Sequence, residues 1–209
     1  TLNTSAQNLF KNESVTLTPK ALKGDGSVNE DVTFSWKVVS GDTAISVSAN
    51  GEVTAKDLGG GVISVSAEGV STQAQITVLP KKVLVVAPIH LNLKPGESQE
   101  LTTKLYKVDK TTGSIVLPAE DNNPSVSYTS AFSLVGMKMV EVGTNGLVKA
   151  KDMAVGSDFI VVTSNTTQDP SEILPGFSSV MIMPGGLDMD NPDLGDLGNL
   201  GNLGGLPVQ

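Results

Sequence analysis

Few residues in this chain could support catalysis. Histidine occurs once, at His90, and cysteine is absent. A Ser-His-Asp triad needs a histidine with correctly placed partners, and zinc sites usually need several histidines or cysteines, so most hydrolases and zinc enzymes are excluded. Glycoside hydrolysis needs two acids that face one cleft, but several acids fall in predicted turns: Asp25, Asp42, Asp121 and Asp158. We therefore predict a non-enzyme with no catalytic residue and no cofactor.

One acidic segment has the oxygen density that calcium prefers. Residues 188–193 begin like an EF-hand loop. Pro192 stands where the fifth-position ligand is needed, and Asp193 stands where the sixth-position glycine is needed. We predict a solvated acidic turn here and no metal site, with bound calcium as the alternative.

The charge of the chain excludes two classes of partner. All 14 cationic side chains are lysine, against 22 acids, which gives a net charge of −8 and a pI near 4.6. Phosphate recognition favours the planar guanidinium group of arginine, which is missing. Nucleic acids and anionic lipids attract basic surfaces, so we expect neither as a partner. No apolar run approaches the roughly 20 residues of a membrane helix, so no membrane insertion is expected.

The elements that carry these residues are predicted to be short strands. Apolar and polar residues alternate in many runs, for example at Val32, Phe34, Trp36 and Val38. Alternation of this kind places one side of a strand in a core and the other in water. We predict an all-β chain with six or seven short antiparallel strands in the first repeat and little or no helix. In the run 89–93 the alternation points His90 outward, as a solvated side chain.

Asn-Gly pairs separate some of these strands. Such pairs favour two-residue type I′ turns, which require positive φ at both residues. We therefore predict positive φ at four structural residues: Asn50, Gly51, Asn145 and Gly146.

The chain contains an internal repeat. Asn50-Gly51-x-Val53-x-Ala55-Lys56-Asp57 reappears as Asn145-Gly146-x-Val148-x-Ala150-Lys151-Asp152. Shorter and weaker sequence matches lie before and after this block, and the offset between the two copies grows along the chain. The second copy therefore carries insertions on both sides of its Asn-Gly turn, as loops between strands of one scaffold allow.

The repeat divides the chain into three predicted parts. We expect residues 1–80 and 81–184 to form two tandem β-sandwiches, followed at residues 185–209 by a tail rich in Gly, Leu and Asp. Pro80-Lys81-Lys82 is the predicted junction, with two exposed lysines that blunt a sheet edge. Pro88 splits the first strand of the second copy, as expected for a strand that leaves one sheet and joins the other.

The order of motifs in the first copy resembles the bacterial immunoglobulin-like group-two domains of invasin- and intimin-type surface proteins. The resemblance rests on a strand with Trp36, the Asn50-Gly51 turn, Val53-Thr54-Ala55-Lys56, a glycine cluster and Ile63-Ser64-Val65-Ser66. In the second copy Tyr128 stands near the place of Trp36. The resemblance implies two immunoglobulin-like β-sandwiches in an exported cell-surface lipoprotein that acts as an adhesion or spacer module. Its partner would be a protein or glycan on a host or neighbouring cell.

A carbohydrate-binding module of a surface glycan-capture system is the alternative. A sugar binder needs two or three coplanar aromatic rings on its surface, whereas a spacer needs none. Alternation places Trp36 in the core, which leaves Tyr106, Tyr128 and five phenylalanines as candidates.

The tail follows a different pattern. Leucine and glycine each recur at every third residue from Leu194 and Gly195 onward. A period of three matches an extended left-handed helix with three residues per turn. We expect its leucine edge to dock on a sandwich or to mediate self-association, and a flexible acidic linker is the alternative.

Overall fold

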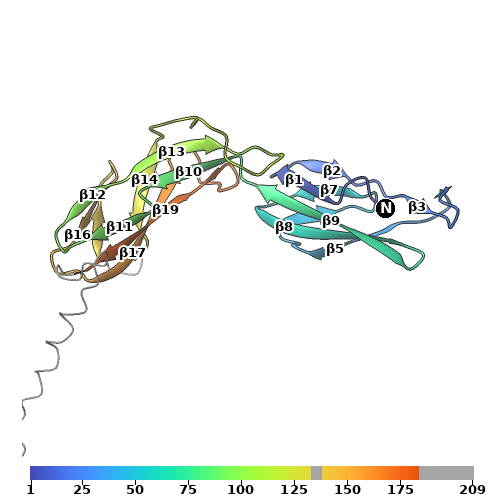
Figure 1. Ribbon diagram of the computed structural model, residues 1–209, viewed down its shortest axis with the longest axis horizontal. Coiled ribbons are helices and arrows are strands. Elements are labelled where there is room, and N and C mark those ends of the chain that lie inside the picture. The colour runs from blue at the N-terminus through green and yellow to red at the C-terminus, as the bar shows by residue number, and fades with distance from the viewer. Residues whose placement is uncertain (133–137, 184–209) are drawn as a thin grey trace, which may run out of the picture.

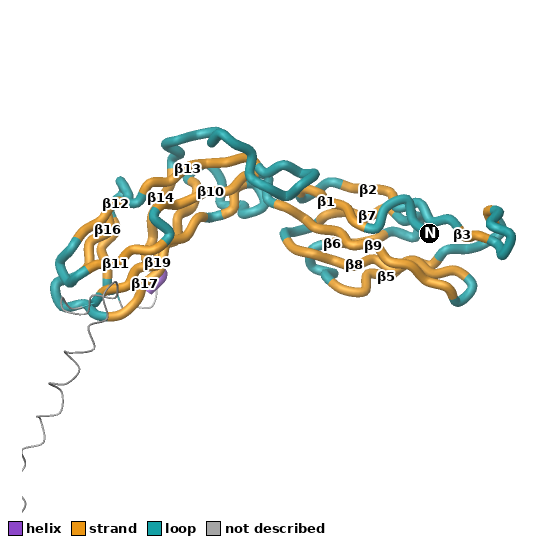
Figure 2. The backbone as a smooth tube through the Cα atoms, viewed as in Figure 1, coloured by secondary structure: helices purple, strands orange, loops and turns teal. Residues whose placement is uncertain are grey.

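The computed structural model describes residues 1–132 and 138–183. This part of the chain is nearly all β, with a short 3₁₀ turn at Ala131 and Phe132 and no α-helix. Figure 1 shows two β-sandwiches joined end to end with a bend between them. Figure 2 shows that they consist almost entirely of strands and connecting loops. The chain is thus a pair of tandem immunoglobulin-like β-sandwiches.

The first sandwich contains nine strands. They are β1 (Ala6–Phe10), β2 (Ser14–Thr16), β3 (Ala21–Leu22), β4 (Val28–Asn29), β5 (Ser35–Ser40), β6 (Ile45–Val47), β7 (Glu52–Ala55), β8 (Gly59–Ala67) and β9 (Val70–Leu79). One sheet has the order β1-β9-β8-β5, the opposite sheet has the order β2-β7-β6, and β3 and β4 form a small hairpin.

Within residues 81–132 and 138–183, the second sandwich contains ten strands. They are β10 (Lys82–Ala87), β11 (His90–Leu93), β12 (Ser98–Glu100), β13 (Thr102–Lys107), β14 (Val126–Ser130), β15 (Val140–Val142), β16 (Leu147–Ala150), β17 (Gly156–Ser164), β18 (Ile173–Leu174) and β19 (Gly176–Ile182). Its sheets have the orders β11-β19-β17-β14, β12-β16-β15 and β13-β10-β18.

The internal repeat is visible in the topology. The sheet β1-β9-β8-β5 matches β11-β19-β17-β14 strand for strand, and β2-β7-β6 matches β12-β16-β15. The split first strand is confirmed, because β10 and β11 lie on either side of Pro88 in different sheets.

The prediction of six or seven antiparallel strands in the first repeat is wrong, because this repeat contains nine strands and one pair of them is parallel. β1 pairs in parallel with β9, and β11 pairs in parallel with β19. In a tandem array the chain enters a sandwich at one end and leaves at the other. The first and last strands therefore run in the same direction, and they pair in parallel where they meet.

Two separate groups of buried side chains form the interior. The first group contains Leu9, Leu17, Ala44, Ile45, Val53, Ala55, Ile63, Ala74, Ile76 and Val78. The second contains Leu84, Val86, Leu91, Leu93, Leu101, Val140, Val148, Ala150, Ile160, Val162, Val180 and Ile182. Each group is built from alternate residues of facing strands, as the apolar alternation predicts. Half-buried Trp36 packs against the first group, and half-buried Tyr128 packs against the second.

The predicted type I′ geometry is wrong at both Asn-Gly turns. Gly51 and Gly146 have φ of 78° and 85°, but Asn50 and Asn145 are not among the residues with positive φ. The N–H of Gly51 donates to the Ser48 carbonyl, and that of Gly146 donates to the Gly143 carbonyl. Each turn is therefore one residue longer than predicted and ends on a left-handed glycine, which is a common three-residue hairpin loop.

The insertions of the second copy lie in two loops. Residues 108–125 connect β13 to β14, where the first copy has only the short β3–β4 hairpin region. Residues 165–175 connect β17 to β19, whereas the matching strands β8 and β9 are joined by a tight turn at Glu68 and Gly69.

Asp158 does not lie in a turn, contrary to the prediction. It stands on β17 with 0% of its surface exposed, because the alternation of this strand turns it inward together with Ile160 and Val162. Its carboxylate accepts hydrogen bonds from the Ser130 hydroxyl (2.8 Å) and the Phe159 N–H (2.7 Å). Asp158 is therefore a satisfied polar group inside the second sandwich.

Replacing Asp158 with alanine is expected to lower the free energy of unfolding by about 1–3 kcal/mol, because buried donors lose their acceptor. Asp158→Asn is the matched control, since its amide oxygen can still accept one of these hydrogen bonds. Chemical denaturation of the full chain measures both variants. If the two variants lost the same unfolding free energy, the hydrogen bonds to this side chain would contribute nothing to stability.

Candidate functional site at the junction of the two sandwiches

The residues singled out for structural roles form a matching pair of contacts. A Cβ atom on Gly51 would lie 2.5 Å from Trp36 Cζ2, and one on Gly146 would lie 3.1 Å from Tyr128 Cζ. Each glycine thus lies against an aromatic ring in its own sandwich. The carbonyls of Gly51 and Gly146 also accept hydrogen bonds of 2.9 Å from the N–H groups of Leu17 and Leu101. These contacts fix the turns to the body of each sandwich.

His90 points outward, as predicted. It is exposed on β11, and its Nδ1 lies 2.6 Å from the Ser179 hydroxyl on the neighbouring strand β19. This is a surface hydrogen bond between paired strands.

Other predictions concern metal ions, membranes and the tail. Within residues 1–132 and 138–183, no group of three or more acidic or histidine side chains is arranged to hold a metal ion. No helix in the described part is both long and apolar enough to cross a membrane. The calcium prediction at 188–193 and the docking or self-association of the tail lie outside the described residues.

The strongest cluster of charged side chains lies between the two sandwiches. Lys110, from the loop 108–125, bonds both carboxylate oxygens of Glu13 at 3.1 and 3.3 Å. Its Nζ also lies 5.9 Å from the centre of the Phe10 ring, within the range of a cation–π contact. Beside it, the Asn8 amide donates to the Thr111 carbonyl at 3.2 Å. One loop of the second sandwich thus contacts the end of β1 and the turn that follows it.

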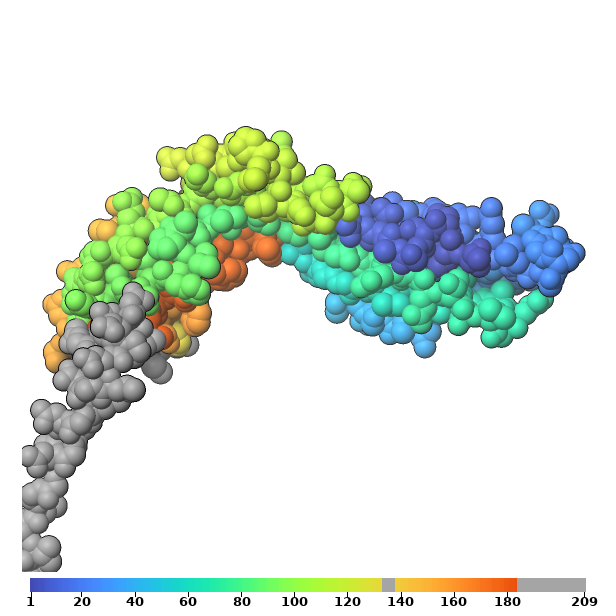
Figure 3. Space-filling model, viewed as in Figure 1, coloured from blue at the N-terminus to red at the C-terminus, as the bar shows by residue number. Residues whose placement is uncertain are grey.

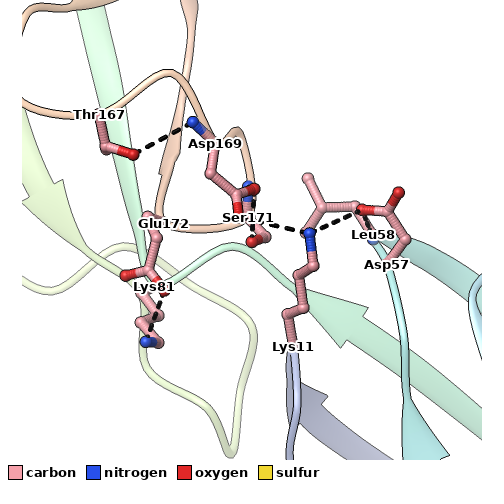
Figure 4. A network of polar contacts seen from close by, with 8 residues as sticks. All are labelled: Lys11, Asp57, Leu58, Lys81, Thr167, Asp169, Ser171 and Glu172. Carbon is pink, nitrogen blue, oxygen red and sulfur yellow. Dashed lines mark hydrogen bonds and ion pairs between the residues drawn. The ribbon is translucent and has the colours of Figure 1, made fainter.

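The other insertion makes a second contact to the same turn. Lys11 Nζ lies 3.3 Å from Asp169 Oδ2 in the loop 165–175, and 3.9 Å from Asp57 Oδ1 in its own sandwich. Figure 4 shows Lys11 between these two carboxylates. The Ser171 hydroxyl (2.7 Å) and N–H (2.9 Å) both bond Asp169 and hold its carboxylate toward Lys11. We call the Lys110–Glu13 and Lys11–Asp169 pairs together the junction clasp.

Of the two lysines predicted to be exposed at the junction, Lys81 is exposed and Lys82 is half-buried, and both are held in ion pairs. Lys81 Nζ pairs with Glu172 at 2.7 Å, and Lys82 Nζ pairs with Glu120 at 2.9 Å. The Lys81 N–H also donates to the Ser171 carbonyl. The segment that links the sandwiches is therefore bonded to the second one along its length, because β10 begins at Lys82, directly after the junction.

Local hydrogen bonds and charges favour the ionised carboxylates of the clasp. The pKa of Glu13 lies below its ordinary value, chiefly because its carboxylate accepts a hydrogen bond from the Phe10 N–H and then because of Lys110. The pKa of Asp169 is lowered chiefly by the Ser171 hydroxyl and N–H, with a smaller effect of Lys11. Both acids therefore stay charged at neutral pH and remain available to the lysines.

The side-chain bonds that join the two sandwiches involve the inserted loops. Lys110 and Thr111 belong to the first insertion and Asp169 to the second. The sequence predicted insertions at these places, but it carried no sign of their role, because Lys11 and Asp169 are far apart along the chain. Figure 3 shows the loop 108–125 reaching from the second sandwich onto the first.

Neither a protein-family model nor a curated protein matches the chain. Among solved structures it is similar to domains 4 and 5 of the S-layer protein SbsC, with 18% identity over 80% of this chain and 81% of that one, at a TM-score of 0.33. Domains 5–6 of SbsC give 16% identity over 89% and 97%, at a TM-score of 0.35. Invasin, a bacterial integrin-binding protein, gives 13% identity over 87% of this chain and 38% of its own, at a TM-score of 0.31. At these identities and TM-scores the similarity carries no argument about function or ligand.

Proposed function

We propose that this chain is a non-catalytic part of an exported bacterial surface protein, in which it acts as a stiff spacer that presents an adhesion function away from the cell. In this proposal the two sandwiches are bacterial immunoglobulin-like modules with boundaries at 1–80 and 81–184. The junction clasp is the observation that carries the spacer role. Domains joined by a short linker move relative to one another by default unless their interface restrains them.

The parallel pairing of first and last strands supports the same role. β1 and β9 run in one direction, as do β11 and β19, so each sandwich passes the chain from one end to the other. Lengths then add along the array. A clasp at the junction keeps the two ends of the pair far apart, because a bent but stiff pair of sandwiches cannot fold back on itself.

Surface labelling tests the location. An antibody raised against residues 1–183 is expected to label intact cells of the source organism, and brief protease treatment of those cells should remove the label. Labelling that appears only after the cells are permeabilised would contradict the proposal.

Acid is expected to loosen the junction. The folded-state pKa values of Glu13 and Asp169 are lowered, so their ion pairs are complete above the ordinary carboxylate pKa of about 4. They are lost as the pH falls through the lowered values. Small-angle X-ray scattering should give one unchanged particle shape from neutral pH to about pH 5 and a more variable one below about pH 4.

The double variant Lys11→Met and Lys110→Met is the matched comparison for this prediction, since it removes both lysine charges of the clasp and keeps most of the length of each side chain. At neutral pH its scattering should resemble that of the wild type in acid. A shape that depends on pH in the same way with and without these two lysines would assign the acid effect to carboxylates outside the clasp.

A further inference from the structure

Three large apolar side chains are exposed on the outer face of the sheet β11-β19-β17-β14. Phe159 on β17, Phe177 on β19 and Met181 on β19 have 48%, 58% and 43% of their surfaces exposed. In the register of these paired strands, Phe159 is opposite Ser179 and so lies diagonally next to both Phe177 and Met181. Diagonal neighbours on one face of a sheet are about 7–8 Å apart, within reach of each other for aromatic side chains. We call this group the phenylalanine face.

The same face of the sheet carries no charge. The outward positions of β11, β19, β17 and β14 hold His90 and Val161 in addition to small polar residues: Asn92, Ser127, Thr129, Ser157, Thr163 and Ser179. None of these outward residues is an acid or a lysine. The phenyl rings are therefore surrounded by hydroxyl, amide and imidazole groups.

The first sandwich shows that the scaffold does not require these side chains. Ile63 pairs with Ala74 in the first copy as Ile160 pairs with Ser178 in the second, which aligns the two sheets. In this alignment Phe159, Phe177 and Met181 correspond to Val62, Gln73 and Thr77. The same sheet is thus built without an aromatic ring at either position.

We propose that the phenylalanine face binds a neutral oligosaccharide. A pyranose ring presents C–H groups on its faces, which stack on phenyl rings, and hydroxyl groups at its edge, which suit the surrounding serine, threonine and asparagine side chains. An anionic ligand would find no cation among the outward residues of these four strands. A second copy of the chain is the competing occupant, and the light-scattering measurement below tests for it. This inference does not rest on the spacer role.

Isothermal titration of the full chain with maltohexaose, cellohexaose, xylohexaose, mannohexaose and chitohexaose tests the proposal. At least one of these sugars should bind with a millimolar or tighter Kd. Phe177→Gln and Phe159→Val should each weaken that binding about tenfold, and the double variant should abolish it. Both replacements restore the residue that the first copy holds, so the fold is expected to persist, and an unchanged melting temperature confirms this.

Val39→Gln is the matched control, because Val39 is 52% exposed on β5 of the first sandwich and its replacement removes apolar surface elsewhere. It should leave sugar binding unchanged. Absence of binding to all five sugars would overturn the proposal, and so would binding that both phenylalanine variants retain. A dimer in light scattering that Phe177→Gln dissolves, without sugar binding, would instead identify the face as a self-association surface.

Discussion

Replacing Gly51 with valine is expected to lower the unfolding free energy of the first sandwich by about 2–6 kcal/mol. A residue forced into positive φ carries strain of about 1–3 kcal/mol, and the φ of Gly51 is 78°. A side chain there would also meet the Trp36 ring at 2.5 Å and the Leu17 carbonyl at 2.7 Å, and overpacking of this kind costs about 1–3 kcal/mol more. The Leu17 carbonyl cannot move away easily, because the Leu17 N–H donates a hydrogen bond to the Gly51 carbonyl.

Gly24→Val is the matched control, because Gly24 has open space where a Cβ would lie. Urea denaturation of both variants makes the comparison. If Gly51→Val lost no more unfolding free energy than Gly24→Val, the positive φ and close contacts of Gly51 would not matter for stability. Gly146→Val should repeat the effect in the second sandwich, because the Leu101 carbonyl lies 2.6 Å from the position of its Cβ.

Replacing Trp36 with alanine is expected to destabilise the chain by about 3 kcal/mol, the lower end of the range for removing a large aromatic side chain from a core. Trp36 is half-buried, packs against the first core group and lies against Gly51. Its removal opens a space that the turn cannot fill, because Gly51 has no side chain and its carbonyl is held by Leu17.

The control for Trp36 lies on the same strand. Val39 on β5 is 52% exposed, and Val39→Ala should change stability by less than about 0.5 kcal/mol, as surface substitutions usually do. A loss below about 1 kcal/mol for Trp36→Ala would place the ring outside the core and make it available to a ligand.

Strand alternation predicted much of this fold, because burial of one strand face is a local property. The inward residues Ile63, Val65 and Ile76 follow directly from their spacing. The same rule turns Asp158 inward, yet the sequence favoured a turn there because a lone carboxylate rarely lies in a core. Its partner Ser130 is on another strand, and no local pattern shows that a hydroxyl will be in place.

Contacts between distant segments could not be predicted in this way. The insertions in the second copy were visible from the repeat, but the pairing of Lys110 with Glu13 depends on how one sandwich is set on the other. The outward positions of Phe159 and Phe177 follow from the alternation of their own strands. That the two rings lie next to each other depends on the register between β17 and β19, which no local pattern shows.

The central claim is that the junction clasp holds the two sandwiches in one orientation. The chain has no cysteine, so spin labels can be attached at Lys37→Cys and Thr129→Cys, two exposed positions that flank Trp36 and Tyr128 in matching strands. Pulsed electron spin resonance then measures the distance between the sandwiches. We predict one narrow distance distribution for the clasped chain and a clearly broader one when Lys11→Ala and Lys110→Ala are added. A distribution that is already broad with the clasp intact, or one that stays narrow without it, would contradict the claim.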